Sequence, residues 1–143
     1  MASFLAAAAK APPGTRSSTS SKRVLEPSGR VVVADLEVAV ESATRKKGLL
    51  GRDGLAEGSG LVIAPTNAVH TFFMRFPIDI VFVTKTGEVV KVRQAVPAWR
   101  MAAVLRGYAV IELPSGAAER AGLRVRDRVA LRRRESLEAR SFV

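Results

Sequence analysis

The sequence contains no cysteine, a single histidine and a single tryptophan, and aromatic residues make up only 6% of its 143 residues. Without cysteine the chain can form no disulfide bond, thiolate zinc site, iron–sulfur cluster or cysteine nucleophile. No apolar run approaches the ~18 residues of a membrane-spanning helix, so we expect no membrane span. A lone histidine without clustered oxygen ligands also gives no reason to expect a metal site, and we predict no cofactor.

Positive charge is what the composition has in excess. The chain carries 23 Lys and Arg against 13 Asp and Glu, a formal net charge of +10 and a pI of about 11.2. Residues 1–30 hold five bases against one acid, residues 120–143 hold eight arginines against three acids, and residues 31–119 hold ten bases against nine acids. A basic excess is typical of nucleic-acid binding, but the neutral body leaves nucleic acid an alternative partner rather than the favoured one.

The chain divides into three parts by composition. Residues 1–23 contain Ala, Ser, Thr, Pro and Gly with scattered bases, and such a segment cannot repay its ordering entropy, so we predict a disordered basic tail. Residues 24–134 form one predicted domain, and residues 135–143 form a short C-terminal tail. We expect a cytoplasmic monomer; a cleavable targeting segment within the acid-poor N-terminus stays open as the alternative.

Short runs of alternating or continuous apolar residues recur at intervals of about ten residues. They predict strands followed by turns, a pattern typical of a mostly β (α+β) domain, a compact barrel or a sandwich-like fold. The expected strands cover residues 35–41, 61–64, 78–83, 88–93, 108–113 and 123–132. Helix-forming residues predict a short helix over 41–50 and one helical turn over 117–121.

The segment His70–Asp79 is the densest in polar and aromatic side chains. Asp79 lies within an apolar strand pattern, so its carboxylate needs a partner, and Arg75 is the nearest candidate in sequence. Arg52 or Arg100 could also reach it across the fold. Asp79 either caps a turn or pairs with one arginine to fix strand register, or it joins Arg75 and His70 in a site for an anion or a sugar.

Two further positions stand out. Trp99 beside Arg100 could stack on a sugar or a base, although a lone tryptophan more often fills a core or a barrel mouth. Glu112 lies in an apolar strand, and we expect it to pair with an arginine. The favoured function is a non-catalytic binding or accessory domain with a polar site drawn from Arg52, His70, Arg75, Asp79, Trp99, Arg100 and Glu112. An enzyme with Asp79 or Glu112 as general base and His70 as its partner is an alternative.

The C-terminal arginines support a different function. Alternation over 123–132 places basic side chains on one face of the predicted strand. Such a face could bind nucleic acid or another anionic surface without sequence preference, or it could keep an edge strand from aggregating. The residues concerned are Arg124, Arg126, Arg128 and Arg132.

Four ordered segments give the chain a family resemblance. They are Arg45–Arg52, which follows the form R-x-x-G-L-x-G-R; His70–Asp79, which follows H-T-F-x-M-R-F-P-I-D; the strand 81–83 with its hairpin 86–90; and Val110–Arg120, which follows V-L-E-L-P-x-G-x-A. The chain therefore resembles the domain of unknown function 192 family, a group of small uncharacterised microbial proteins. The resemblance implies a compact β-rich fold and carries no established activity, substrate or cofactor.

The chain departs from the family pattern at two places. Ala98 separates Pro97 from Trp99 where the family has Pro-Trp-Arg, and Arg126 precedes Asp127 where the family often has Gly-Asp. A turn that requires a positive φ would be strained by arginine, because its Cβ approaches the following carbonyl group.

Overall fold

The structure is a computed structural model that describes residues 23–27, 30–41, 45 and 48–133. The predicted tails, apart from Arg23, and half of the helix expected over 41–50 (residues 42–44, 46 and 47) lie outside the described residues. Among the described residues no helix is long and apolar enough to cross a membrane.

The described chain is mostly β, as predicted, with a single short helix. The strands are β1 (Arg23–Pro27), β2 (Val33–Ala39), β3 (Ser59–Ile63), β4 (Ala68–His70), β5 (Ile78–Val83), β6 (Val89–Val96), β7 (Met101–Ala103), β8 (Ala109–Pro114) and β9 (Val129–Arg133), and the helix is α2 (Ala117–Arg120). The predictions for β2, β3, β5, β6 and β8 and for the helical turn at 117 are confirmed within a few residues at each end.

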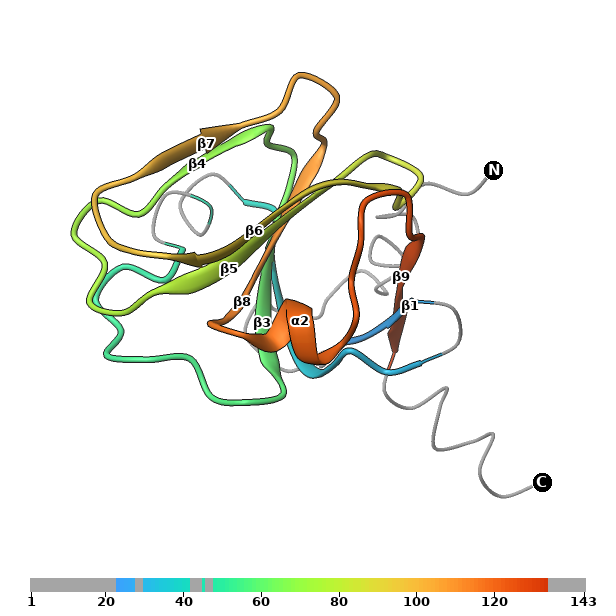
Figure 1. The fold of residues 1–143 in the computed structure, drawn as a ribbon, viewed down its shortest axis with the longest axis horizontal. Coiled ribbons are helices and arrows are strands. Elements are labelled where there is room, and N and C mark those ends of the chain that lie inside the picture. Colours follow the sequence, from blue (N-terminus) through green and yellow to red (C-terminus); the bar gives the residue numbers. More distant parts are fainter. Residues whose placement is uncertain (1–22, 28–29, 42–44, 46–47, 134–143) are drawn as a thin grey trace.

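Seven strands form one sheet in the order β6-β5-β8-β3-β2-β1-β9, and β4 pairs with β7 in a second, two-stranded sheet (Figure 1). Among the described strands only β2 and β3 run parallel; the other pairs are antiparallel. An isolated bridge between Glu88 and Arg128 brings the starts of the two edge strands β6 and β9 together. The large sheet is strongly curved but does not close into a barrel over the described residues, and the fold is sandwich-like.

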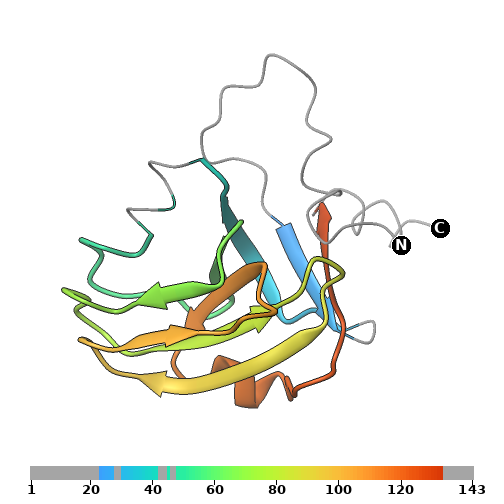
Figure 2. The same ribbon diagram turned by 90° about the horizontal axis from the view of Figure 1, so that it is seen from above.

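Each face of the large sheet is covered by its own hydrophobic cluster. α2 and the curved end of the sheet cover one face, where Val81 and Ile111 are buried. The two-stranded sheet covers the other, where Ile80 and Val110 are buried. Figure 2 shows α2 and the β4–β7 pair on opposite sides of β5 and β6. All six residues of β5 and of β8 are buried, since both faces of these strands are covered.

The expected strand over 123–132 is wrong in its first half, because β9 begins only at Val129. Residues 124–127 form a turn: the Asp127 N–H donates to the Arg124 carbonyl at 3.1 Å, and the Arg124 N–H donates to Asp127 Oδ2 at 2.9 Å. Arg124, Arg126 and Arg128 therefore do not share one strand face. Arg126 has φ +80°, which is in the left-handed region. This is the conformation expected at a position where the family often has glycine.

Candidate functional site

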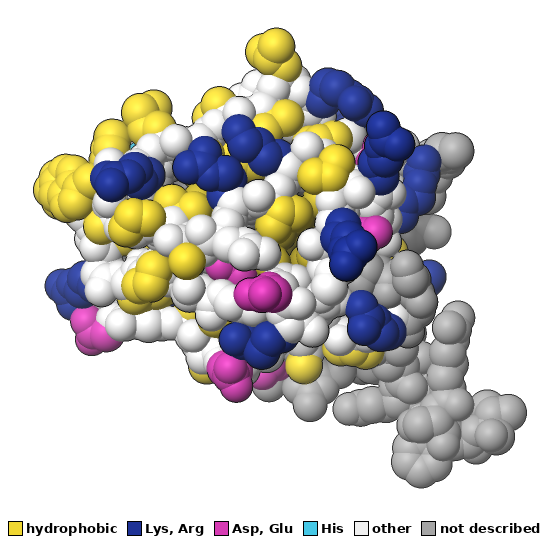
Figure 3. Space-filling model, in the orientation of Figure 1, with side chains coloured by type: hydrophobic (Ala, Val, Ile, Leu, Met, Phe, Trp, Pro, Cys, Tyr) yellow, Lys and Arg dark blue, Asp and Glu magenta, His cyan; other side chains and the backbone are white. Residues whose placement is uncertain are grey.

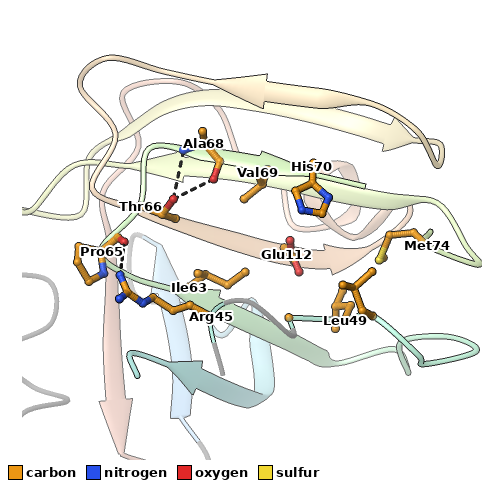
Figure 4. A pocket seen from close by; sticks show the side chains of 12 residues that line it. Arg45, Leu49, Ile63, Pro65, Thr66, Ala68, Val69, His70, Met74 and Glu112 are labelled. Atoms are coloured by element: carbon orange, nitrogen blue, oxygen red, sulfur yellow. Dashed lines mark hydrogen bonds between the residues drawn. The ribbon is translucent and has the colours of Figure 1, made fainter. Parts of the chain in front are cut away.

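A cavity of about 250 Å³ lies between β4 and the large sheet, on the face away from α2 (Figure 4). Its wall combines apolar side chains from the turn at 48–50, from β3 and from β4 with a few polar ones. The lining residues are Arg45, Gly48, Leu49, Leu50, Ile63, Pro65, Thr66, Ala68, Val69, His70, Met74 and Glu112. Polar and apolar surface contribute equally to this wall, so the cavity offers polar groups that can orient a small molecule beside apolar groups that can pack against it.

Glu112 reaches this cavity because of its position in β8. Successive side chains of a strand point to opposite faces, so Val110 and Glu112 lie on the cavity side while Ile111 and Leu113 face α2. Only 5% of Glu112 is exposed, and its Oε2 atom is buried without a hydrogen-bond partner among the described residues. Figure 4 shows its carboxyl group between His70 and Ile63. A buried carboxylate oxygen left without a partner is energetically costly unless something binds it.

Burial raises the pKa of Glu112 to about 7, and the positive charge of Arg52 opposes this shift only in part. The expectation that Glu112 pairs directly with an arginine is wrong for the described residues. Arg52 instead donates to both carboxylate oxygens of Glu37, at 3.2 and 2.7 Å. That hydrogen-bonded pair raises the pKa of Arg52 above its ordinary value.

Three polar groups accompany Glu112 in the cavity wall. Arg45 donates from Nη1 to the Pro65 carbonyl at 3.0 Å, and its Nε is buried without a partner among the described residues. Thr66 Oγ1 donates to the Ala68 carbonyl at 2.9 Å. His70 Nδ1 accepts the Phe72 N–H at 3.3 Å, so the neutral ring carries its proton on Nε2.

Asp79 lies outside the cavity. It is fully buried on the α2 face of β5, where its carboxylate accepts the N–H groups of Ala95 at 2.8 Å and Ala118 at 2.9 Å. The proposed pairing with Arg75, Arg52 or Arg100 is wrong, since Asp79 is bound by backbone donors. Arg75 is exposed and pairs with Asp53 at 2.6 Å. The predicted site of Arg75, His70 and Asp79 is therefore not assembled.

Trp99 and Arg100 lie on the surface beside the cavity. Trp99 is 57% exposed, so the prediction that this lone tryptophan fills a core or a barrel mouth is wrong. Its ring contacts Phe73 edge-on with centroids 4.7 Å apart and lies 5.8 Å from Phe72, which in turn stacks on His70 at 5.0 Å. Of the seven residues expected to form one polar site, only Glu112 and His70 line the cavity, and Arg52 acts on Glu112 through its charge.

Sequence reasoning missed Arg45 as a cavity residue, although it opens the R-x-x-G-L-x-G-R segment. The sequence did contain an indication of this role: Arg45 is the first residue of that segment, and no acidic residue was predicted to pair with it. Among the described residues no group of three or more His, Asp or Glu side chains is placed to hold a metal ion.

Comparisons with known proteins agree with this fold. The model of a family described as Uncharacterized ACR, the domain of unknown function 192, matches residues 23–131. A protein of unknown function from Novosphingobium aromaticivorans DSM 12444 has a similar crystal structure, with a TM-score of 0.66, 24% identity, and coverage of 74% of this chain and 82% of that one.

A protein from Sinorhizobium meliloti 1021, described as a "putative transcription regulator", superposes with a TM-score of 0.67 and 20% identity over 80% of this chain and 97% of that one. At these identities the two likenesses establish the fold alone. A comparison with curated proteins gives no match.

Proposed function

Since the chain belongs to the domain of unknown function 192 family, a name that assigns no activity, we propose a function from its geometry: the cavity beside Glu112 binds a small organic ligand. The observation that carries the proposal is the buried Oε2 atom of Glu112, which has no partner among the described residues and borders an open cavity. A ligand that donates a hydrogen bond to this oxygen would supply the partner that it lacks.

The lining sets the chemistry of the ligand. Glu112 requires a donor, such as a hydroxyl or ammonium group, while Leu49, Val69 and Met74 offer an apolar wall for a compact hydrocarbon body. A carboxylate ligand would place a second negative charge beside Glu112, which is unfavourable in a buried setting, although the buried Nε of Arg45 offers it a donor elsewhere in the wall. The proposed ligand class is therefore small alcohols and amines, and acids are the contrasting case in the test.

Cavity size limits the ligand further. About 250 Å³ is below the ~300–1,000 Å³ of pockets that hold drug-sized molecules. Figure 4 shows Arg45 and Thr66 at one side of the cavity and Glu112 and His70 farther along it, so a ligand meets polar groups at more than one place.

A matched series of probes tests this assignment. We would titrate isotopically labelled protein with 3-methylbutan-1-ol, 3-methylbutylamine and 3-methylbutanoate, which share one apolar body and differ in the head group. Saturable chemical-shift changes at Val69, His70 and Glu112 are expected with the alcohol or the amine and not with the acid.

Variants complete the experiment. Glu112→Gln keeps the shape but removes the negative charge, and it should weaken binding of the amine at least about tenfold, the usual order for a buried charge-assisted hydrogen bond. Glu57→Gln, an exposed carboxylate outside the cavity, should leave binding unchanged. Preferential binding of the acid, or shifts confined to residues outside the cavity, would contradict the proposal.

A second candidate function is proton transfer by Glu112. A carboxyl group with a pKa of about 7 is suited to act as a general base near neutral pH, and His70 lines the same cavity. Asp79 cannot take this role, because it lies on the opposite face. A test follows deuterium exchange at the α-carbons of 3-methylbutan-2-one by NMR. Exchange above the buffer rate that is lost in Glu112→Gln supports proton transfer, and a rate equal to that of the buffer contradicts it.

A further inference from the structure

A stripe of exposed apolar side chains runs along β7 and both of its flanks. Met101 and Leu105 alternate with Ala102 and Val104, which pack into the cluster beneath β7, and Trp99 is exposed just before the strand. The exposed fractions are 57% for Trp99, 69% for Met101 and 97% for Leu105. Large apolar groups exposed along one line usually mark an interaction surface.

The loop before β5 adds a fourth member to this stripe. Phe73 is 71% exposed and contacts the Trp99 ring edge-on. Thr71 fixes the two loops to each other, since its carbonyl accepts the Trp99 N–H at 3.1 Å and its hydroxyl donates to the Pro97 carbonyl at 2.7 Å. Phe73 and Trp99 both have positive φ, +63° and +66°, a conformation that costs energy for aromatic residues. The fold thus holds both rings at the surface at a cost in stability.

Arginines accompany the apolar stripe. Arg75, Arg100 and Arg106 each lie within two residues of Phe73, Trp99 or Leu105, and all three are exposed. Two described acids pair with them: Asp53 with Arg75 at 2.6 Å, and Glu88 with Arg106 at 3.8 Å. Figure 3 shows hydrophobic side chains projecting from the left and upper edges of the molecule, around β7, with Lys and Arg between them. The surface combines protruding apolar groups with positive charge.

We propose that this stripe, Phe73, Trp99, Met101 and Leu105 with the neighbouring arginines, docks on an anionic lipid bilayer. Tryptophan and phenylalanine are well suited to the headgroup boundary, aliphatic side chains gain by entering the acyl region, and arginines attract anionic headgroups. The contact is peripheral and is independent of any ligand in the cavity.

Two other occupants fit less well. A nucleic acid would use the aromatic rings and arginines, but Met101 and Leu105 offer no planar face on which bases stack. A second copy of the chain would bring a like-charged face against this one, since Arg100 has no ion pair with a described acid while Arg75 and Arg106 each have one, and like charges are unfavourable at an interface. A bilayer accepts protruding side chains without a preformed complementary groove, and its negative surface complements the arginines.

The single tryptophan of the chain makes the test direct. The full chain is mixed with vesicles of phosphatidylcholine alone and with vesicles containing 30% phosphatidylglycerol. Co-flotation and a blue shift of Trp99 emission are expected with the anionic vesicles, both reduced by added salt. The emission distinguishes docking through β7 from attachment through the basic ends, because Trp99 reports on its own surroundings.

Variants assign the effect to the stripe. The triple variant Phe73→Asn, Met101→Ser, Leu105→Ser should bind anionic vesicles at least about tenfold more weakly. Each of the three apolar side chains stabilises the bound state by the apolar area that it buries in the bilayer. Asn is chosen at position 73 because it tolerates positive φ. The double variant Val31→Ser, Val125→Ser is the matched control, as these exposed side chains lie outside the stripe. Cooperative thermal unfolding of each variant verifies that it folds.

Several results would overturn the proposal. One is flotation with anionic vesicles without a change in Trp99 emission, which would place the contact at the basic ends. A second is equal vesicle binding by the triple variant and the control variant. A third is a concentration-dependent dimer that the natural protein and the control form and the triple variant does not. A fourth is binding of a single-stranded oligonucleotide without binding of vesicles.

Discussion

Asp79 accepts a hydrogen bond on Oδ2 from the backbone N–H of Ala118 at 2.9 Å, although the two residues are 39 positions apart in the sequence. Its Oδ1 accepts the N–H of Ala95 at 2.8 Å. Ala95 lies in a β-bulge, where two residues of β6 oppose Asp79 between the pairs Ile78–Val96 and Ile80–Arg93. One buried carboxylate therefore joins the first turn of α2 to the irregular part of β6.

Replacing Asp79 by alanine is expected to lower the free energy of unfolding by about 2–4 kcal/mol, because the buried N–H of Ala118 and the partly buried N–H of Ala95 lose their acceptor. Urea denaturation measures this loss. Asp53→Ala is the control, since its ion pair with Arg75 is at the surface and should contribute at most about 1 kcal/mol. Equal effects of the two substitutions would show that Asp79 does not join these elements.

Local patterns predicted the strands well and the partners of their polar residues poorly. Apolar runs interrupted by one acid each, Asp79 and Glu112, identified β5 and β8, and turn residues identified the hairpin at Gly87, which has φ +88°. Asp79 was recognised as needing a partner. Its donors are backbone N–H groups placed by a bulge and by a helix from later in the chain, and no pattern of side chains encodes them.

Strand register explains why the candidate site was only partly correct. Ile80 pairs with Glu112 and Asp79 with Leu113 in the β5–β8 ladder. Side chains at paired positions share a face, so Glu112 lies with Ile80 on the cavity side and Asp79 lies on the other side. A shift of one residue would have placed both carboxylates in one site. The sequence contains both acids but does not give the register that separates them.

Arg126→Gly is expected to stabilise the protein by about 0.5–1 kcal/mol. Arginine at φ +80° pays the steric cost of the left-handed conformation, which exceeds the additional chain entropy that glycine loses on folding. Denaturant unfolding measures the gain. Arg124→Gly removes the same charge from the same turn and should not stabilise; a similar gain in both variants would attribute the effect to charge.

Thr71→Val should destabilise the protein by about 2 kcal/mol, because the buried hydroxyl serves two loops. It donates to the Pro97 carbonyl at 2.7 Å and accepts the Arg100 N–H at 2.9 Å. Thr71→Ser retains the hydroxyl and should lose less. Unfolding followed by Trp99 fluorescence measures both variants, and a larger loss in Thr71→Ser than in Thr71→Val would show that packing of the methyl group, rather than the hydroxyl, holds the loops.

Glu112 makes stability depend on pH in an unusual direction. Burial raises its pKa from 4.5 to about 7, so between these values the folded state holds a proton that the unfolded state has released. Stability from this group is therefore full below pH 4.5, falls as pH rises through 7, and levels off above about pH 8. The total loss is about 3 kcal/mol for a shift of this size.

Glu112→Gln removes this dependence, because the amide stays neutral at every pH. The variant should resemble the natural protein in stability near pH 4.5 and exceed it increasingly toward pH 8, where the natural side chain is a buried anion. Urea denaturation of both proteins from pH 4.5 to 8.5 gives the difference in free energy of unfolding, in which the other titrating groups cancel. Glu57→Gln, an exposed carboxylate, should show a nearly constant difference. A constant difference for Glu112→Gln as well would mean that burial does not shift its pKa, and Glu112 would then not be a general base with a pKa near neutral.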